Sequence, residues 1–361
     1  MNTSQSPDTM QYAMTVNGPI TPSQLGFTLM HEHLFLGGWS PGPGPGTPAS
    51  HVALWETPIK LEHLGLARDG VVFKDLRLDD EPLAIREVFD YRAMGGKTIV
   101  DTTSIGIGRD PSALRKVSVK TGTNIVMGSG WYVKDSHPDD MDDRTAEDLA
   151  EEIIKDITIG IDDVGTRAGI IGEIGINGNP LTSNERKVLI ASAWASKETG
   201  ASISLHYGGF GEERFEVAKL LDHEGADLSR VIFGHSDSYA MDISLLTRLL
   251  STGSCVEFDL LGRPGAPIAR SPGIPGKNPW GPQATDIMVT EILPRLITAG
   301  FAEQLLLSHD IGFKIWLRSR GGNGYTFLLD QVRSHLKQLG ITEAQFRIMT
   351  IETPQRLLTL G

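Results

Sequence analysis

The stretch LGFTLM at residues 25–30 is apolar and runs directly into His31, Glu32 and His33. An apolar run of this length predicts a buried strand, with the two histidines at its end. Residues two apart in an extended strand point the same way, so both imidazoles can reach one ion. The repeat PGPGPG at residues 41–46 follows and predicts an exposed loop.

Seven further apolar stretches follow, and a helix pattern precedes each of them. The expected helices span residues 82–96, 110–122, 145–161, 182–200, 212–225, 243–253 and 285–300. The expected strands span residues 97–104, 124–130, 168–175, 201–209, 230–237, 254–262 and 303–310. Strands that are apolar on both faces and separated by helices indicate a parallel sheet covered by helices. Eight such units predict an α/β fold of the (β/α)₈ TIM barrel type, whereas an open doubly wound sheet would more often carry a Gly-rich phosphate loop after its first strand.

The length of 361 residues allows one large domain or two ordinary ones. The strand count favours a single barrel domain over residues 1–361, because eight units in one barrel need no linker. We expect residues 1–14 to form a polar N-terminal tail, and residues 321–340 and 342–361 to form closing helices.

Composition excludes several classes of protein. Hydrophobic residues make up 40% of the chain and charged residues 22%, which is typical of globular proteins. The net charge of −12, without a cluster of Lys and Arg, argues against a nucleic-acid partner and against an anionic membrane surface. Cys255 is the single cysteine, so no internal disulfide can form. The N-terminal residues show no signal-peptide pattern, and we expect a soluble cytoplasmic protein.

Six residues with metal-binding side chains fall at the ends of five of the expected strands. They are His31, His33, Glu173, His206, His235 and Asp310. Catalytic groups of (β/α)₈ barrels collect at the C-terminal ends of the strands, so these side chains would meet at one mouth. A single His206 or His235 would more often be a hydrogen-bonded core residue. An ionised Glu173 or Asp310 among apolar neighbours is costly unless a cation pairs with it, and the joint occurrence therefore predicts a metal site.

The type of ligand indicates which ions the site would hold. Nitrogen and oxygen ligands suit Zn²⁺, Mn²⁺, Co²⁺ or Fe²⁺, of which we expect Zn²⁺ first. Six ligands exceed what one tetrahedral ion uses, and a glutamate offers two oxygens. We therefore expect two ions, roughly 3.5–4 Å apart and bridged by Glu173. One ion would polarise a carbonyl or phosphoryl oxygen, a shared hydroxide would attack, and Asp310 would take the proton.

Five motifs carry a resemblance to a known family. They are GFTLMHEHLF at 26–35, LHYGG at 205–209, IFGHSD at 232–237, LSHD at 307–310 and ETPQRLL at 352–358. Together they resemble the phosphotriesterase family of the amidohydrolase superfamily, whose members include lactonases and organophosphate hydrolases. The resemblance implies that His31, His33 and Asp310 hold the more buried ion and that His206 and His235 hold the exposed one. It also implies a homodimer.

The bridging residue differs from that of many family members, which carry a carboxylated lysine. This chain has Glu173 in the strand IIGEIG, and in this it resembles a subgroup called phosphotriesterase homology proteins. The exchange keeps a bidentate anion, so we expect the binuclear site to be retained. No carbamate has to form, and we therefore expect the metal site to reassemble without bicarbonate.

Five residues near the expected mouth are candidates for substrate binding. They are Trp131, Tyr132, Phe210, Arg263 and Trp280. By the resemblance, Tyr132 matches a tyrosine that lactonases place near the metal-bound hydroxide, which makes it a catalytic candidate as well; the alternative is a half-buried aromatic at the barrel rim. Trp131 and Phe210 are otherwise core or rim side chains. Residues 262–283 contain six prolines and five glycines, and we expect a loop that covers the substrate or, alternatively, contacts a second subunit.

The expected function is hydrolysis of a carboxylic ester or lactone by a metal-dependent enzyme. The alternative is a hydrolase of organophosphate triesters or amide-type bonds, because the same site can polarise a P=O or a less reactive C=O. Leu260 and Leu261 precede Arg263, whereas lactonases of the family usually place an arginine directly after the aspartate. A non-catalytic small-molecule binding protein is a minor alternative; a missing ligand would be its mark, and none of the six is missing.

Overall fold

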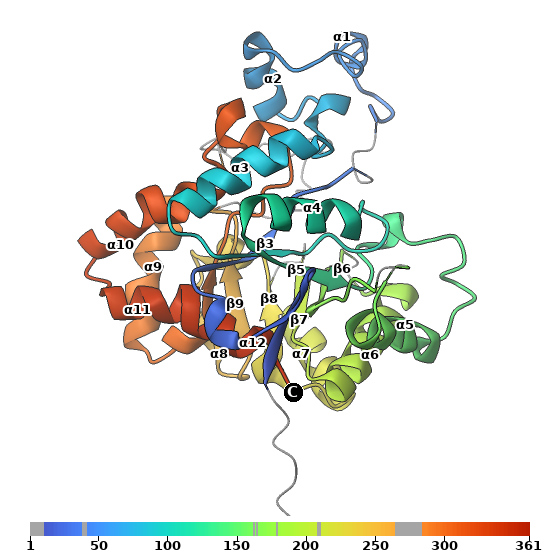
Figure 1. Cartoon of the computed structure of the whole chain (residues 1–361), viewed down its shortest axis with the longest axis vertical. Helices are drawn as coiled ribbons and strands as arrows, with labels where there is room; N and C mark the ends of the chain where they lie inside the picture. Colours follow the sequence, from blue (N-terminus) through green and yellow to red (C-terminus); the bar gives the residue numbers. More distant parts are fainter. Residues whose placement is uncertain are drawn as a thin grey trace, which may run out of the picture.

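Eight parallel strands form the centre of the molecule, and neighbours in the sheet are also neighbours along the chain (Figure 1). They are β3 (Thr28–Glu32), β4 (Thr98–Asp101), β5 (Asn124–Ser129), β6 (Ile170–Ile176), β7 (Ile203–Tyr207), β8 (Val231–Phe233), β9 (Cys255–Phe258) and β10 (Leu305–Leu307). The computed structural model describes residues 11–37, 42–161, 163, 165–177, 180–207, 211–263 and 284–361. At least one helix connects each strand to the next, and the predicted (β/α)₈ TIM barrel is confirmed.

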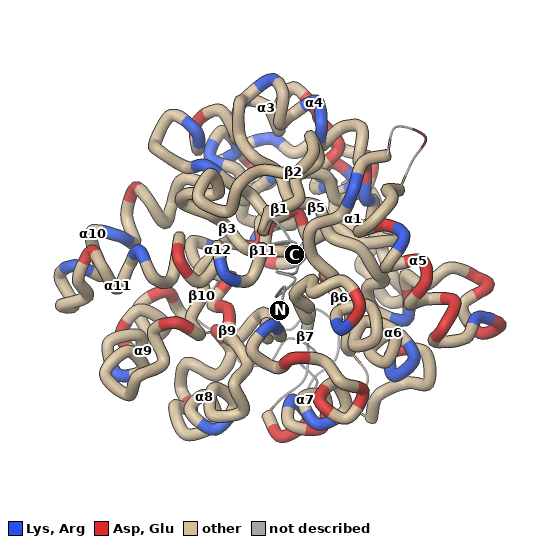
Figure 2. The backbone as a smooth tube through the Cα atoms, turned by 60° about the horizontal axis from the view of Figure 1, so that its bottom comes forward, with Lys and Arg blue, Asp and Glu red and all other residues tan. Residues whose placement is uncertain are grey.

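Helices surround these strands, and Figure 2 shows them as a ring around the centre of the molecule. The connecting helices are α3 (Glu81–Ala93), α4 (Pro111–Thr121), α5 (Ala146–Thr158), α6 (Ser183–Thr199), α7 (Glu213–His223), α8 (Ile243–Leu250) and α9 (Asp286–Thr298). Short polar side chains fix where several of them begin: Asp80, Asp110 and Thr182 each accept a hydrogen bond from a backbone N–H three residues on. Gly122 and Gly200, both with positive φ, end α4 and α6.

The closing helices predicted at the end of the chain are also present. They comprise α10 (Arg333–Gln338), α11 (Glu343–Arg347) and α12 (Thr353–Leu358), and π-helical turns at 328–332 and 348–352 precede α10 and join α11 to α12. No helix within the described ranges is long and apolar enough to cross a membrane.

Side chains join the first strand of the barrel to the last. Ser308 Oγ accepts a hydrogen bond from the His31 N–H at 3.1 Å, and the Asp310 N–H donates to the His31 carbonyl at 3.2 Å. The buried Glu32 carboxylate accepts from the backbone N–H groups of His309 at 2.9 Å and Ile311 at 3.0 Å. These bonds hold the ends of β3 and β10 together, and His31 and Asp310 therefore lie side by side.

The N-terminal segment differs from its prediction. Residues 12–14, assigned above to a polar tail, belong to β1 (Tyr12–Thr15), which pairs with β2 (Gly18–Ile20) and β11 (Thr359–Leu360). Ala13 and Met14 are fully buried, and the Val16 N–H donates to the Ile125 carbonyl near the start of β5 at 2.9 Å. The prediction was wrong because the partner of β1 lies at the far end of the chain. In Figure 2 this small sheet lies at the centre of the ring of helices.

A small helical cap follows the first barrel strand. The PGPGPG segment leads to α1 (Ala49–Val52) and α2 (Leu64–Arg68), which lie at the opposite end of the molecule from the C-terminus in Figure 1. Val71 and Phe73 of this region form a separate apolar cluster with Ile315, which follows β10. The cap is thus anchored on the side where the strands end, and residues 42–46 of the repeat form the expected loop, with all but Pro43 exposed.

Candidate metal centre

Glu173, in β6, lies at the centre of a cluster of imidazoles at the C-terminal ends of the strands. Its Oε1 is 2.7 Å from His206 Nδ1, 3.1 Å from His235 Nε2 and 3.4 Å from His31 Nε2. Its Oε2 is 3.6 Å from His33 Nε2. One carboxylate therefore faces all four histidines that the sequence singles out, although they come from three different strand ends.

Asp310, which follows β10, completes the set. Its Oδ1 lies 3.2 Å from His33 Nε2 and 3.9 Å from His31 Nε2, and its Oδ2 lies 3.8 Å from His235 Nδ1. All six residues are buried. The structure thus brings together every residue of the predicted metal site.

The potential ligand atoms divide into overlapping groups. One group contains His31, His33 and Glu173, and a second contains Glu173, His206 and His235; within each, the ligand atoms lie within 4.8 Å of one another. A third group joins His31 and His235 to Asp310. Glu173 belongs to both of the first two groups, which is the position that a bridging ligand requires.

The donors at this site fit divalent cations. Both ring nitrogens of His31 are buried, and neither has a hydrogen-bond partner among the described residues. Leaving such buried polar atoms unpaired costs free energy. A cluster of neutral imidazoles and carboxylates suits transition-metal ions rather than Ca²⁺ or Mg²⁺, so the chain carries a metal-binding set of residues.

The charges of the cluster reinforce one another. Burial alone would lower the pKa values of His31 and His33, but Glu173 and Asp310 hold both above their ordinary value. Against the same effect of burial, Asp259 and Glu173 raise the pKa of His235 to about 10. Burial would raise the pKa of Glu173, yet the neighbouring imidazoles hold it well below its usual range. Without metal, Glu173 and the imidazoles of His31, His33 and His235 therefore favour one another's charged forms, whereas burial lowers the pKa of His206.

Two of the six residues have an unusual backbone conformation. His235 has a φ of 50° and Asp310 a φ of 47°, and they lie two and three residues after the ends of the short strands β8 and β10. Residues other than glycine rarely adopt this left-handed backbone conformation. Its cost in free energy is tolerated where surrounding contacts fix the backbone. The Asp259 carboxylate supplies such a contact by accepting from the His235 N–H at 3.0 Å. In this conformation His235 faces Glu173 and Asp310 faces His33.

Tyr132 follows β5 and lies against the cluster. Its hydroxyl is 3.2 Å from both ring nitrogens of His206, and the two ring centroids are 4.5 Å apart. Burial, together with the charges of Glu173 and Asp310, raises the pKa of Tyr132 well above its ordinary value. The phenol therefore stays protonated and can donate a hydrogen bond at the metal cluster. His137, which the sequence leaves outside the site, lies 2.8 Å from the Tyr132 carbonyl.

The remaining substrate-binding candidates lie in different places. Arg263 is beside Asp310, and its Nη2 contacts both the Asp310 carbonyl at 2.8 Å and the Asp310 carboxylate. Trp131 is 1% exposed and packs in the core under the guanidinium of Arg144, 5.2 Å from its ring centroid. Phe210, Trp280 and most of the 262–283 segment lie outside the described residues.

Sequence comparison now decides the family. A model described as the phosphotriesterase family matches residues 11–358. The chain belongs to the phosphotriesterase family. As a member of this family it is a hydrolase, and the resemblance drawn from the five motifs is confirmed.

The relatives and solved structures that this chain is similar to carry names that differ in the ligand or activity they state. An N-acetyltaurine hydrolase of Dictyostelium discoideum is 37% identical over 96% of this chain and 97% of its own length. The crystal structure of a resiniferatoxin-binding protein from Rhodobacter sphaeroides has a TM-score of 0.88 and 35% identity, covering 96% of this chain and 94% of that one. A mutant of a phosphotriesterase-like lactonase from Deinococcus radiodurans has a TM-score of 0.72 and 28% identity, covering 96% and 99%.

Two buried acids beneath the centre are missing from the sequence prediction. Asp259, after β9, has its Oδ1 2.9 Å from His235 Nδ1 and its Oδ2 3.4 Å from His31 Nδ1, and Glu257 lies 3.9 Å from the same His31 nitrogen. A carboxylate behind a ligand histidine fixes the ring and its tautomer. Glu257 and Asp259 are two residues apart at a strand end, as His31 and His33 are. Because residues two apart in a strand point the same way, the reasoning that singled out the two histidines could also have found these two acids.

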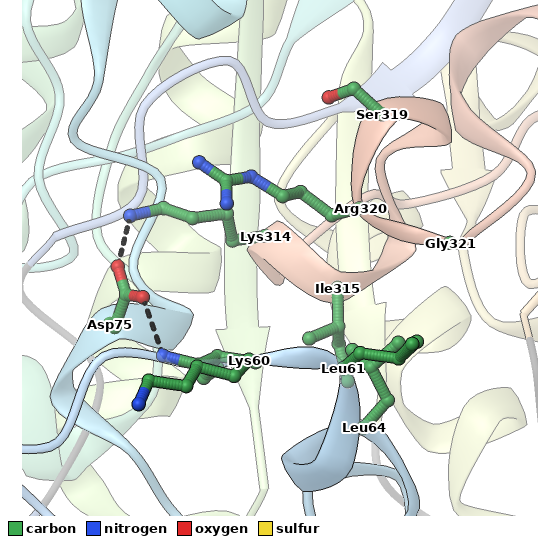
Figure 3. Close-up of a pocket in the computed structure, with 10 residues that line it drawn as sticks. Lys60, Leu61, Leu64, Asp75, Lys314, Ile315, Ser319, Arg320 and Gly321 are labelled. Carbon is green, nitrogen blue, oxygen red and sulfur yellow. Dashed lines mark hydrogen bonds and ion pairs between the residues drawn. The ribbon is translucent and has the colours of Figure 1, made fainter.

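A cavity of about 280 Å³ lies outside the metal cluster, between the cap and the segment after β10 (Figure 3). None of the six cluster residues lines it. Asp75 joins its two walls, because its carboxylate pairs with Lys314 Nζ at 2.7 Å and accepts from the Ile59 N–H at 2.9 Å. Of the cationic residues that line this cavity, Lys314 is thus paired with Asp75, and the residues of the metal cluster lie elsewhere.

Proposed function

We propose that this chain is a binuclear metal-dependent hydrolase that cleaves a carboxylic amide of the kind found in N-acetyltaurine. The observation that carries the proposal is the convergence of four imidazoles on Glu173, with Asp310 beside them. We favour amide cleavage over ester or lactone cleavage, because a relative named as an N-acetyltaurine hydrolase is 37% identical over 96% of this chain.

The residues assigned to the two ions follow from the two groups that share Glu173. His31 and His33 would hold one ion and His206 and His235 the other, with Asp310 as a further ligand and Zn²⁺ as the first choice of metal. Divalent ions bound at this site would polarise a substrate carbonyl and lower the pKa of a coordinated water toward neutral pH. Glu173 keeps the site compact, because its single carboxylate faces both pairs of imidazoles.

Asp310 is the group placed to move a proton. Burial would raise its pKa, but Arg263 and the neighbouring imidazoles hold the pKa of Asp310 below its usual range. The carboxylate is therefore ionised and can accept the proton of the attacking water. Cleavage of an amide releases a poor leaving group, so this proton must then pass to the amine nitrogen. Asp310 can perform both transfers.

Tyr132 would stabilise the oxygen of the substrate carbonyl. Its phenol is buried, protonated and next to His206. A hydrogen bond from this O–H to an oxygen that gains negative charge is stronger in the transition state than in the ground state.

A substrate panel on Zn²⁺-, Mn²⁺- and Co²⁺-loaded protein tests the proposal. The panel contains N-acetyltaurine, other N-acyl amides, γ- and δ-lactones, aryl esters and a paraoxon-type triester. We expect the largest kcat/KM for an N-acyl amide. Rapid lactone or triester turnover with inert amides would overturn this order, and binding of less than about one ion per chain would instead support the non-catalytic alternative.

Lactone hydrolysis is the second candidate. The position of the Tyr132 hydroxyl beside His206 favours it, because lactonases of the family are expected to use a tyrosine there. The relative from Deinococcus radiodurans is described as a lactonase. The same panel separates the two candidates, since a lactone carries a better leaving group and does not need the second proton transfer.

A further inference from the structure

The turn that carries Arg263 is held on several sides. The Gly262 N–H is 3.2 Å from both carboxylate oxygens of Asp286, at the start of α9, and the Asn323 side-chain amide donates to the Gly262 carbonyl at 2.6 Å. A Cβ on Gly262 would lie 2.6 Å from the Phe327 ring, and the φ of this glycine is +79°. Arg263 therefore leaves the barrel from a fixed point.

The guanidinium of Arg263 is also fixed in orientation. Its Cζ lies 4.2 Å from the centroid of the Trp316 ring, so the plane is supported by an aromatic face. Nη2 donates to the Asp310 carbonyl at 2.8 Å and contacts the Asp310 carboxylate. Nε is shielded from solvent and has no hydrogen-bond partner among the described residues. The side chain retains 18% exposure, so the described residues do not enclose it completely.

The position of Asp310 relates Arg263 to the reacting groups. One oxygen of this carboxylate is 3.2 Å from His33 Nε2, and the other contacts Arg263. The guanidinium is therefore separated from the imidazole cluster by a single carboxylate group. A substrate whose carbonyl lies at the cluster would reach Arg263 through a spacer of on the order of two carbon atoms, since each bond adds about 1.5 Å.

The balance of charge favours an anion at this place. Glu173, Asp310 and Asp259 each place a carboxylate oxygen against an imidazole of the cluster, at 2.7 Å from His206, 3.2 Å from His33 and 2.9 Å from His235 respectively. Two divalent ions together with Arg263 exceed these three negative charges. An anionic substrate would offset the excess, and a planar guanidinium binds carboxylate or sulfonate oxygens through two parallel N–H groups.

We propose that Arg263 is a specificity-determining residue that binds an anionic group, a sulfonate or a carboxylate, attached by a short chain to the scissile amide. The inference rests on the proposed function and narrows it to amides with such a group. Arg263 would then have two partners in succession. It pairs with Asp310 in the free protein, and it binds the anionic group of the substrate when Asp310 accepts the proton of the attacking water.

The test compares two amides of equal length, N-acetyltaurine and the uncharged methyl sulfone in which S–CH₃ replaces S–O⁻. We expect Arg263→Gln to lower the ratio of their kcat/KM values by about tenfold or more, mainly through KM, because a charge-assisted pair is lost. Arg263→Lys should restore part of this ratio, since it keeps the charge but not the fork. Arg248→Gln is the matched control, because Arg248 pairs with Glu212 on the exposed surface.

Calorimetric binding separates this inference from the proposed function. The probes are 4-oxopentane-1-sulfonate, a ketone that cannot be hydrolysed, and its uncharged methyl sulfone, each titrated into metal-loaded protein of verified metal content. Preference for the sulfonate in the wild type and its loss in Arg263→Gln would support the inference even if neither amide is cleaved. Equal weakening of charged and uncharged ligands would overturn it, even if N-acetyltaurine is a substrate, because Arg263 would then act by positioning Asp310.

Discussion

Asp310 is the residue on which the separate parts of the site meet. It contacts His33 through one oxygen and Arg263 through the other, and its backbone N–H donates to the His31 carbonyl. Its φ of 47° shows that the chain tolerates strain in order to place this carboxylate. A change in its charge should therefore affect the chemistry far more than the fold.

Asp310→Asn is expected to lower kcat at least 100-fold, because an amide cannot accept the proton that the carboxylate takes. The variant should stay folded, since the hydrogen bond from the backbone N–H is retained. Steady-state kinetics with a metal analysis checks the first expectation and circular dichroism the second. Unchanged turnover would remove Asp310 from the mechanism.

The protonated histidines lead to a second prediction at this scale. The pKa values of His31 and His33 are raised, and that of His235 is about 10, so the metal-free protein favours the protonated form of these imidazoles. A metal ion binds the neutral ring. Binding should therefore release protons, and apparent metal affinity should fall as pH falls.

Calorimetry in two buffers of different ionisation enthalpy measures that release. Burial lowers the pKa of His206, so His206→Ala should leave the proton count per bound ion less affected than His235→Ala. A heat of zinc binding that does not depend on the buffer would contradict the prediction.

At the scale of elements, the position of Glu173 depends on how closely β5 and β6 approach each other. Gly128 in β5 lies against Gly172, the residue before Glu173, and a Cβ on Gly128 would be 1.8 Å from the Gly172 carbonyl oxygen. No side chain fits at such a distance. The glycine in the strand NIVMGS is therefore required by packing between backbones, which the apolar pattern of the strand does not reveal.

Gly128→Ala should destabilise the protein by about 3 kcal/mol or prevent folding, because the backbone of β6 would have to move. Gly65→Ala is the control: it lies in α2, and nothing is within 4 Å of an added Cβ, so its effect should stay within about 0.5 kcal/mol. Denaturant unfolding of both variants measures the difference. Equal stability would show that the two strands can separate without cost.

At the scale of the whole molecule, contacts between distant parts of the chain complete the barrel. Glu32 and Ser308 join β3 to β10, and β1 pairs with β11 from the other end of the chain. The candidate metal centre lies at the same closure, since His31 and Asp310 are bonded across it. Metal binding and the integrity of the closed barrel should therefore be coupled.

Removal of metal by a chelator should lower the melting temperature by several degrees, and added Zn²⁺ should restore it. An ion at 1,000 times its Kd stabilises the folded state by about 4 kcal/mol. Differential scanning calorimetry measures this shift. Glu173→Gln, which loses the charge shared by both ligand groups, should respond less, and a wild-type melting temperature unaffected by the chelator would refute the coupling.

The sequence by itself determined the eight strands, their connecting helices and the six residues of the metal cluster. Periodicity is a local property, and parallel strands of a barrel all end on one side, so the residue after each strand could be assigned to the mouth. Tertiary structure alone decided the β1–β11 pairing, the contact of Asp259 with His235 and the placement of Arg263 beside Asp310. Each of these joins segments whose distance in space no local pattern encodes. The reason is physical: such contacts form only when the closed barrel brings its strand ends and chain ends together.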